Sequence, residues 1–92
     1  MNKYRRPLIE RLQDKIVEIR GLVEDLIYEV EGIKDEEQEA YDNLPENFQK
    51  SDRGYAMDEA IGNLNNALSC LESDIYNALD EVEDYLEEAK QC

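Results

Sequence analysis

The residues of this chain that could do chemistry are carboxylates, and many of them stand at helical spacing. The chain has 92 residues, with 24 acidic side chains against 10 lysines and arginines, for a net charge of −14. A dense group lies near the middle of the sequence, at Glu31, Asp35, Glu36, Glu39, Asp42 and Glu46. Duplex DNA carries one negative charge per about 1.7 Å of axis, and proteins grip it with grooves of Lys and Arg. Carboxylates along a stiff helix could occupy such a groove in place of DNA.

The distribution of charge along the chain supports that hypothesis. Residues 1–20 carry six bases and three acids, whereas residues 24–47 carry ten acids and one base, Lys34. Residues 72–88 carry eight acids and no base. Direct binding of nucleic acid by this chain is therefore not expected. The simpler interpretation is that the acids are solvated and keep the protein soluble.

Other chemistry has little support in the sequence. There is no histidine, no Gly-rich phosphate loop and no Cys-x-x-Cys pair, so we expect no catalytic residues and no cofactor. Asp35, Glu37 and Glu39 alternate as in a calcium loop, but Ala40 follows where an EF-hand has glycine, so no metal site is expected. Cys70 and Cys92 are separated by roughly 33 Å of helix at about 1.5 Å rise per residue, which predicts two free thiols.

Two heptad seams indicate which elements position the acids. Apolar residues spaced alternately three and four apart run through both halves of the chain, broken once, by Glu37. Proline, asparagine and glycine between residues 43 and 54 interrupt the pattern. The sequence therefore predicts an all-α fold, a long antiparallel helical hairpin forming one domain over residues 1–92. We place helix one at about 7–42, the turn at about 43–52 and helix two at about 53–91, with Pro7 leaving the exact start of helix one open.

The two seams also predict a register and an assembly. A turn centred near Phe48 aligns the seams in apolar layers: Ala40 with Met57, Ile33 with Leu64, Leu26 with Leu71, Ile19 with Ala78, and Leu12 with Tyr85. The same register places the basic residues Lys3, Arg5, Arg6, Arg11, Lys15 and Arg20 beside the acids of residues 80–88. Further apolar residues at Leu8, Leu22, Ile27, Leu79 and Leu86 widen the stripe, so we expect a homodimeric helical bundle.

Aromatic residues bracket the turn. Tyr41, Leu44 and Phe48 precede it or lie in it, and Tyr55 opens helix two. Such residues commonly fold back over the end of a core. If Phe48 or Tyr55 is instead exposed, an aromatic anchor ringed by acids has the composition of a binding hot spot.

No segment has the length and apolar composition of a signal peptide or a membrane span, so we expect a cytoplasmic protein without membrane contact.

The chain resembles small acidic helical proteins encoded by phages and prophages of gut bacteria. The resemblance rests on Asp35-Glu-Glu-Gln-Glu-Ala-Tyr-Asp-Asn-Leu-Pro-Glu-Asn-Phe-Gln-Lys-Ser-Asp-Arg-Gly54 and Met57-Asp-Glu-Ala-Ile61. It covers the middle third of the chain and implies no residue roles. Small acidic phage products often block host nucleic-acid enzymes, CRISPR effectors and restriction enzymes among them. The resemblance thus implies a bacterial host cell as the place of action.

These observations together predict a non-enzymatic inhibitor. We expect it to bind a protein with a basic groove, such as a defence nuclease or a CRISPR effector, through Glu31, Asp35, Glu36, Glu39, Asp42, Glu46, Phe48 and Tyr55. Two alternatives stay open. One is a structural coiled-coil module that only oligomerises. The other is an oligomeric sponge for a nucleotide signal, held by Lys3, Arg5, Arg6 and Arg11.

Overall fold

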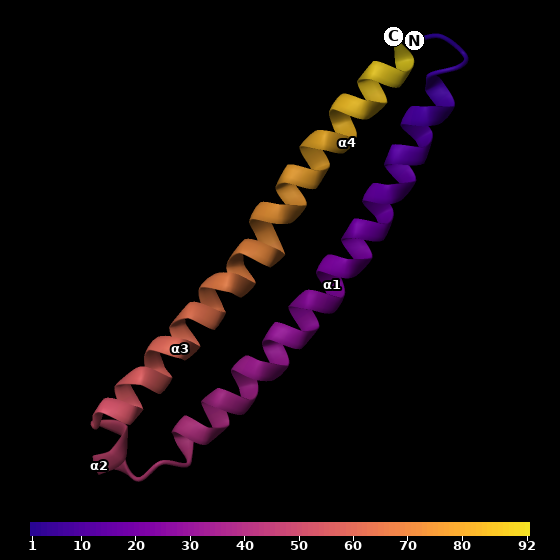
Figure 1. The fold of residues 1–92 in the computed structure, drawn as a ribbon. Coiled ribbons are helices and arrows are strands. Elements are labelled where there is room, and N and C mark those ends of the chain that lie inside the picture. The colour runs from indigo at the N-terminus through magenta and orange to yellow at the C-terminus, as the bar shows by residue number, and fades with distance from the viewer.

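Two long helical limbs lie side by side and run in opposite directions in the computed structural model, which describes residues 1–92 (Figure 1). The first limb is α1 (Arg6–Asp42), and the second comprises α3 (Asp52–Ser69), a π-helical turn η1 (Cys70–Asp74) and α4 (Ile75–Gln91). A short helix, α2 (Glu46–Gln49), lies in the connection. The predicted all-α antiparallel hairpin is confirmed.

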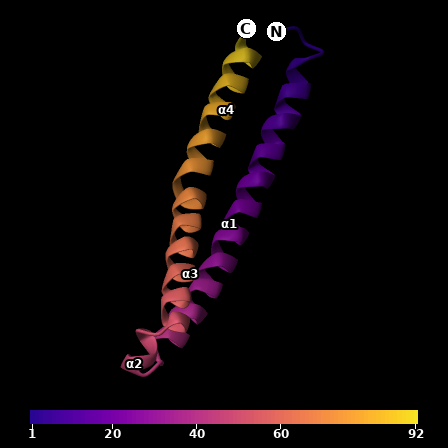
Figure 2. The same cartoon turned by 60° about the vertical axis from the view of Figure 1, so that its left-hand side comes forward.

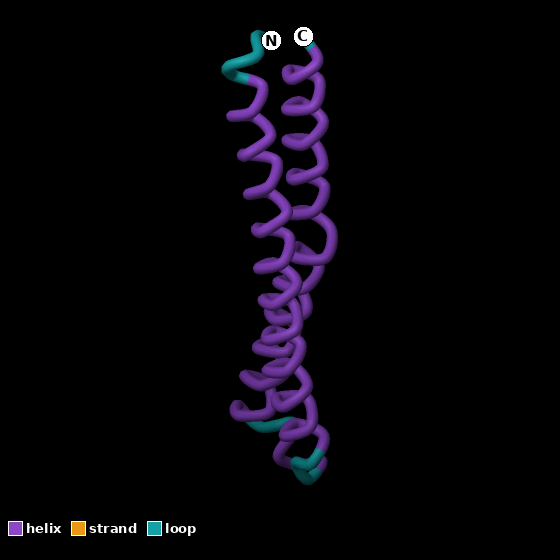
Figure 3. Tube along the Cα trace, turned by 90° about the vertical axis from the view of Figure 1, so that its right-hand side faces the viewer, coloured by secondary structure: helices purple, strands orange, loops and turns teal.

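The hairpin is a thin rod with both termini at one end. Its extents are 68 × 16 × 13 Å. Figure 2 shows the two termini together at one end and α2 at the other. In Figure 3 the limbs stand apart at the terminal end and overlap toward the turn, so they wind about each other over their length. No helix combines the length and the apolar composition needed to cross a bilayer.

Helix α1 begins at Arg6, with Pro7 in its first turn, where a missing backbone N–H costs no hydrogen bond. The preceding turn is closed by Asn2, whose side-chain Oδ1 accepts hydrogen bonds from the backbone N–H groups of Tyr4 and Arg5 at 3.0 and 2.9 Å. No proline follows before the turn, so the helix continues for 37 residues.

Hydrogen bonds between side chains and the backbone close the turn. Gln49 Nε2 donates to the backbone oxygens of Tyr41 and Leu44 at 3.1 and 3.2 Å, which ties α2 to the end of α1 and to the residues that follow it. Ser51 caps α3, its Oγ accepting from the N–H of Gly54 at 3.3 Å. Gly54 is buried against the backbone of α2, and a Cβ there would overlap the carbonyl of Gln49 and lie 2.6 Å from that of Phe48.

The core is a single narrow seam. Five apolar residues are buried, two from the first limb and three from the second: Ile16, Val23, Ile61, Leu68 and Leu71. The sequence also predicted that Leu12, Ile19 and Ile33 of α1 lie in the packed layers. These residues are far more exposed, at 45%, 43% and 56%. Each limb therefore buries only one edge of its apolar stripe in this contact.

The register predicted for the last third of the chain is wrong, because η1 contains an extra residue within its turn. Beyond Leu71 the prediction placed Ala78 and Tyr85 against α1, yet Ala78 is exposed and Tyr85 is 72% exposed. Leu79 and Leu86, one residue further along, are half-buried instead. A π-turn rotates the following helix by about one residue, and here it replaces alanine and tyrosine in the contact with two leucines.

Candidate functional site

The rod has two flanks, one on each side of the seam, and a cross-helix ion pair identifies the first. Arg20 donates from Nη2 to Asp80 Oδ1 at 2.6 Å, and its guanidinium also contacts Glu83, with Nη2 3.2 Å from Oε2. At about 100° per residue, the α1 side chains at 24, 31, 35, 39 and 42 lie within roughly 100° of Arg20. We call this surface of α1 the acidic flank: Glu24, Glu31, Asp35, Glu39 and Asp42.

The predicted acids are almost all open to solvent. Asp35, Glu36, Glu39, Asp42 and Glu46 are exposed, and Glu31 is half-buried. Glu36 lies farther around α1 than the acidic flank, and Glu46 belongs to α2, so the predicted set spans more than one face.

Few bases neutralise these carboxylates. Lys34 Nζ lies 3.6 Å from Asp35, and Lys50 Nζ lies 3.8 Å from Glu46, both pairs being solvent-accessible. Asp42 accepts a hydrogen bond from the neutral amide of Gln38 at 2.9 Å. No base of α3 forms an ion pair with an acid of α1. Exposed pairs contribute less than about 1 kcal/mol, so the turn half of the rod retains nearly its full negative field.

Two of the aromatic side chains around the turn are exposed. Phe48 is 54% exposed and Tyr55 is 61% exposed, whereas Tyr41 and Leu44 are half-buried at the end of the core. On α3, Asp52, Asp58 and Glu59 stand three or four residues from Tyr55 and share its face. Phe48 and Tyr55 are therefore exposed rather than folded back over the end of the core.

The basic residues of the first limb form fewer ion pairs with the acids of residues 80–88 than the predicted register implies. Of the six, Arg20 alone forms a cross-helix ion pair, and its hydrogen bonds to Glu83 and then Asp80 raise its pKa above the ordinary value. Arg6 donates instead to the backbone oxygens of Lys90 and Met1, and Lys3 lies over the ring of Tyr4. Arg5, Arg11 and Lys15 are exposed without an ion partner.

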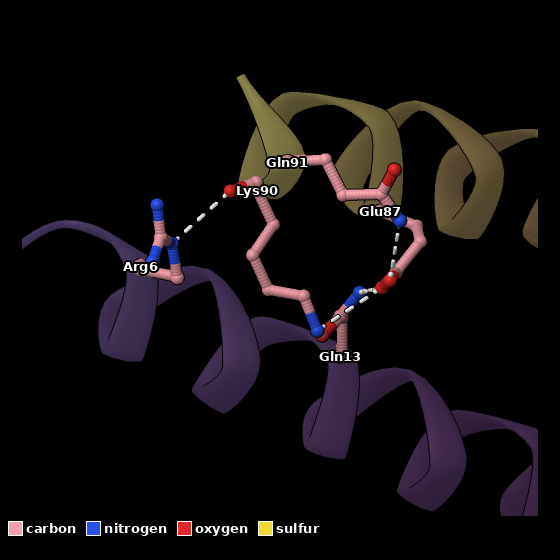
Figure 4. A network of polar contacts seen from close by, with 5 residues as sticks. All are labelled: Arg6, Gln13, Glu87, Lys90 and Gln91. Carbon is pink, nitrogen blue, oxygen red and sulfur yellow. Dashed lines mark hydrogen bonds and ion pairs between the residues drawn. The ribbon is translucent and has the colours of Figure 1, made fainter. Parts of the chain in front are cut away.

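A polar network ties the terminal end together (Figure 4). Glu87 accepts from Gln13 Nε2 at 2.9 Å and from Gln91 Nε2 at 3.1 Å, and Lys90 Nζ lies 3.1 Å from the same carboxylate. Lys90 also donates to Gln13 Oε1 at 3.2 Å. Hydrogen bonds from Gln13 first, then Lys90 and Gln91, lower the pKa of Glu87 from 4.5 to about 2.

Two members of the acidic surface escaped the sequence prediction. Glu24 lies on the acidic flank about two turns before Glu31, and Tyr28 between them is 81% exposed. The spacing 24, 28, 31, 35 would have identified both, since residues three and four apart share a helix face.

The acids and aromatic residues of this chain form an extended, solvent-exposed surface. The molecule has no pocket, and no three acids or cysteines converge as a metal site would require. Cys70 and Cys92 are both free and exposed. Comparison with family models, curated proteins and solved structures finds no match to this chain.

Proposed function

We propose that this chain is a non-enzymatic inhibitor whose acidic flank and turn end occupy the basic groove of a nucleic-acid-handling protein. A bacterial defence nuclease or CRISPR effector, met in the host cytoplasm, is the partner that fits a phage-type product. We also propose that the chain works as a homodimer, because the hairpin alone buries five apolar residues.

The observation that carries the proposal is the density of unpaired charge along α1. Between Glu24 and Asp42 the helix carries nine acids and one base. At about 1.5 Å rise per residue, that is one carboxylate per about 3 Å of axis, close to the ~3.4 Å spacing of phosphates along one DNA strand. A groove that binds phosphates at that spacing could bind these carboxylates with the same lysines and arginines.

The exposed aromatics add an apolar anchor to this surface. Phe48 and Tyr55 supply apolar area beside the acids, and buried aromatic anchors surrounded by polar contacts dominate many protein interfaces. Charge would then give the rate of encounter and aromatic burial the lifetime of the complex.

The test is capture of a partner from a bacterial lysate with two charge-matched variants. The flank variant combines Glu31→Gln, Asp35→Asn, Glu39→Gln and Asp42→Asn. The control variant combines Asp25→Asn, Asp74→Asn, Glu81→Gln and Glu88→Gln, four exposed acids away from the acidic flank whose side chains make no polar contact. Both variants remove the same number of aspartates and glutamates.

We expect wild type and control to capture a nucleic-acid enzyme that elutes with salt, because screening weakens exposed charge pairs. The flank variant should bind it at least about tenfold more weakly, equivalent to about 1.4 kcal/mol. Equal loss in both variants would show that net charge alone matters. Recovery of the chain alone would favour the structural coiled-coil module.

A further inference from the structure

A second heptad seam runs along α1 beside the buried one and is about half exposed. Its members alternate four and three residues apart, at Leu8, Leu12, Lys15, Ile19, Leu22, Leu26, Glu29 and Ile33. The six apolar members are between 43% and 67% exposed, the most exposed being Leu22. A seam with this spacing is the pattern by which one helix packs against another.

The second limb adds apolar residues on the same side of the rod. Arg20 and Asp80, which touch, mark the opposite side. Around α4, Val82 and Tyr85 lie roughly 160° and 140° from Asp80, and Ile19 lies about 100° from Arg20 around α1. Val82 is 46% and Tyr85 72% exposed, because the π-turn has rotated them out of the seam. We call this surface the apolar flank: Leu8, Leu12, Ile19, Leu22, Leu26, Ile33, Val82 and Tyr85.

The apolar flank is too large to be an ordinary patch of monomer surface. From the exposed fractions of its eight residues, it presents on the order of 700 Å², taking roughly 150–200 Å² for a fully exposed large side chain. Monomers rarely expose contiguous apolar patches above a few hundred Å². A standard interface buries about 800 Å² per partner, so this flank with the polar residues at its edges is close to the size of a stable dimer interface.

We propose that a second copy of this chain docks on the apolar flank, with the two rods antiparallel, to form a four-helix bundle. In that arrangement each α1 packs on the α1 of the other copy. The spacing of the seam is symmetric about a centre between Ile19 and Leu22. When a second α1 runs in the opposite direction about that centre, its Glu29 lies one layer away from Lys15 of the first copy. Each Lys15 then meets the Glu29 of the second copy, giving two complementary contacts.

The charge of the whole rod favours the same polarity. Residues 21–71, the turn half, carry thirteen acids and three bases, whereas residues 1–20 and 72–92 together carry eleven acids and seven bases. Parallel rods would hold two strongly negative turn halves side by side, and antiparallel rods hold them at opposite ends of the bundle.

This inference adds the docking face and the polarity to the homodimer of the proposed function, and it does not depend on the binding of a basic groove. The acidic flank lies on the other side of each rod and stays open in the dimer. If the chain captures no partner, the proposed dimer is unaffected. If the chain is a monomer, capture from the lysate still tests the groove-binding proposal.

The face is tested by sedimentation equilibrium on the full chain and two matched variants. Leu22→Gln with Tyr85→Gln alters the apolar flank, and Val17→Gln with Tyr28→Gln alters residues of similar exposure on the opposite side, 64% and 81% against 67% and 72%. Wild type and control should have twice the 10.7 kDa chain mass. The flank variant should dissociate at least tenfold more readily while circular dichroism shows it still helical. A monomeric wild type, or equal weakening in both variants, would overturn the proposal.

The polarity is tested by a spin label on Cys92 in a Cys70→Ser background, with the distance measured by pulsed dipolar spectroscopy. Both thiols are exposed, so the label and the serine should not disturb the hairpin. Antiparallel rods centred on the seam place the two labels on the order of 50 Å apart at about 1.5 Å rise per residue. Parallel rods place them within about 20 Å, at the spacing of neighbouring helices, and that result would refute the proposed orientation.

Discussion

Gly54 is the residue on which the turn depends most directly. It is the one buried glycine, and its Cα packs against the carbonyls of Phe48 and Gln49. Gly62, eight positions later in the same helix, faces open space. The same substitution should therefore have opposite effects at the two positions.

We predict that Gly54→Ala destabilises the hairpin by about 1–3 kcal/mol, the usual cost of overpacking against backbone that cannot move aside. Gly62→Ala should stabilise it by up to about 1 kcal/mol, from helix propensity alone. Urea unfolding followed by circular dichroism measures both. Similar effects at the two positions would mean that the loop does not press on α3.

Glu87 gives the terminal end a pH dependence of known sign. Its pKa falls from 4.5 to about 2 on folding, mainly through the hydrogen bond from Gln13. A carboxyl whose pKa is lower in the folded state stabilises that state above pH 4.5, and the contribution disappears as the pH falls toward 2.

We predict that Glu87→Gln is less stable than wild type at neutral pH and that the difference shrinks to nothing between pH 4.5 and about 2. Glu88→Gln is the control for loss of one charge, since the Glu88 carboxylate accepts no hydrogen bond. Unfolding free energies across this pH range test the idea. A constant difference between wild type and Glu87→Gln would contradict it.

Among the elements, the π-turn η1 sets which face of α4 meets α1. Its extra residue brings Leu79 and Leu86 toward the seam and turns Val82 and Tyr85 away from it. Removing one residue inside η1 should restore regular α-helix while leaving those leucines in place.

We predict that deletion of Ser73 is neutral or slightly stabilising. Deletion of Asn66, equally exposed but within regular α-helix, should cost at least about 2 kcal/mol, because it rotates Ile61 out of the core. Thermal unfolding of the two deletions compares them. If both are equally damaging, the π-turn is required in its present form.

The seams and the interruption near Pro45 were enough to predict the hairpin, because heptad spacing and helix-breaking residues act locally. The register of α4 was not predictable from the strict seam, which treats every apolar residue alike. Leu79 and Leu86 were visible as extra apolar residues, but their advantage over Ala78 and Tyr85 appears only when they are packed against α1. Among the candidate residues, exposure of Phe48 and Tyr55 depended on how the loop closes through Gln49 and Ser51, which spacing does not encode.

For the molecule as a whole, a net charge of −14 is held on a rod with five buried apolar residues. Like charges repel along the rod, and five ion pairs offset little of that repulsion because most are solvent-exposed. Dissolved salt should therefore strengthen the fold while it weakens binding to a basic partner.

We predict that raising the ionic strength from about 10 mM to about 0.5 M increases the midpoint of thermal unfolding, because the Debye length falls well below the length of the rod. A gain of about 1 kcal/mol would correspond to about 4–8 °C for a domain of this size. Scanning calorimetry at fixed protein concentration measures the shift, with sodium chloride and potassium chloride as parallel salts. A midpoint that falls with salt would mean that attractive pairs dominate the folded state.

Because the chain starts and finishes at the same end of the rod, anything fused to either terminus emerges far from α2. A purification tag, a fluorophore or an immobilising tether attached there would leave the turn end, with α2, free in solution. Surfaces coated with the molecule through its termini would thus present a dense brush of carboxylates, accessible to any cationic protein passing over them.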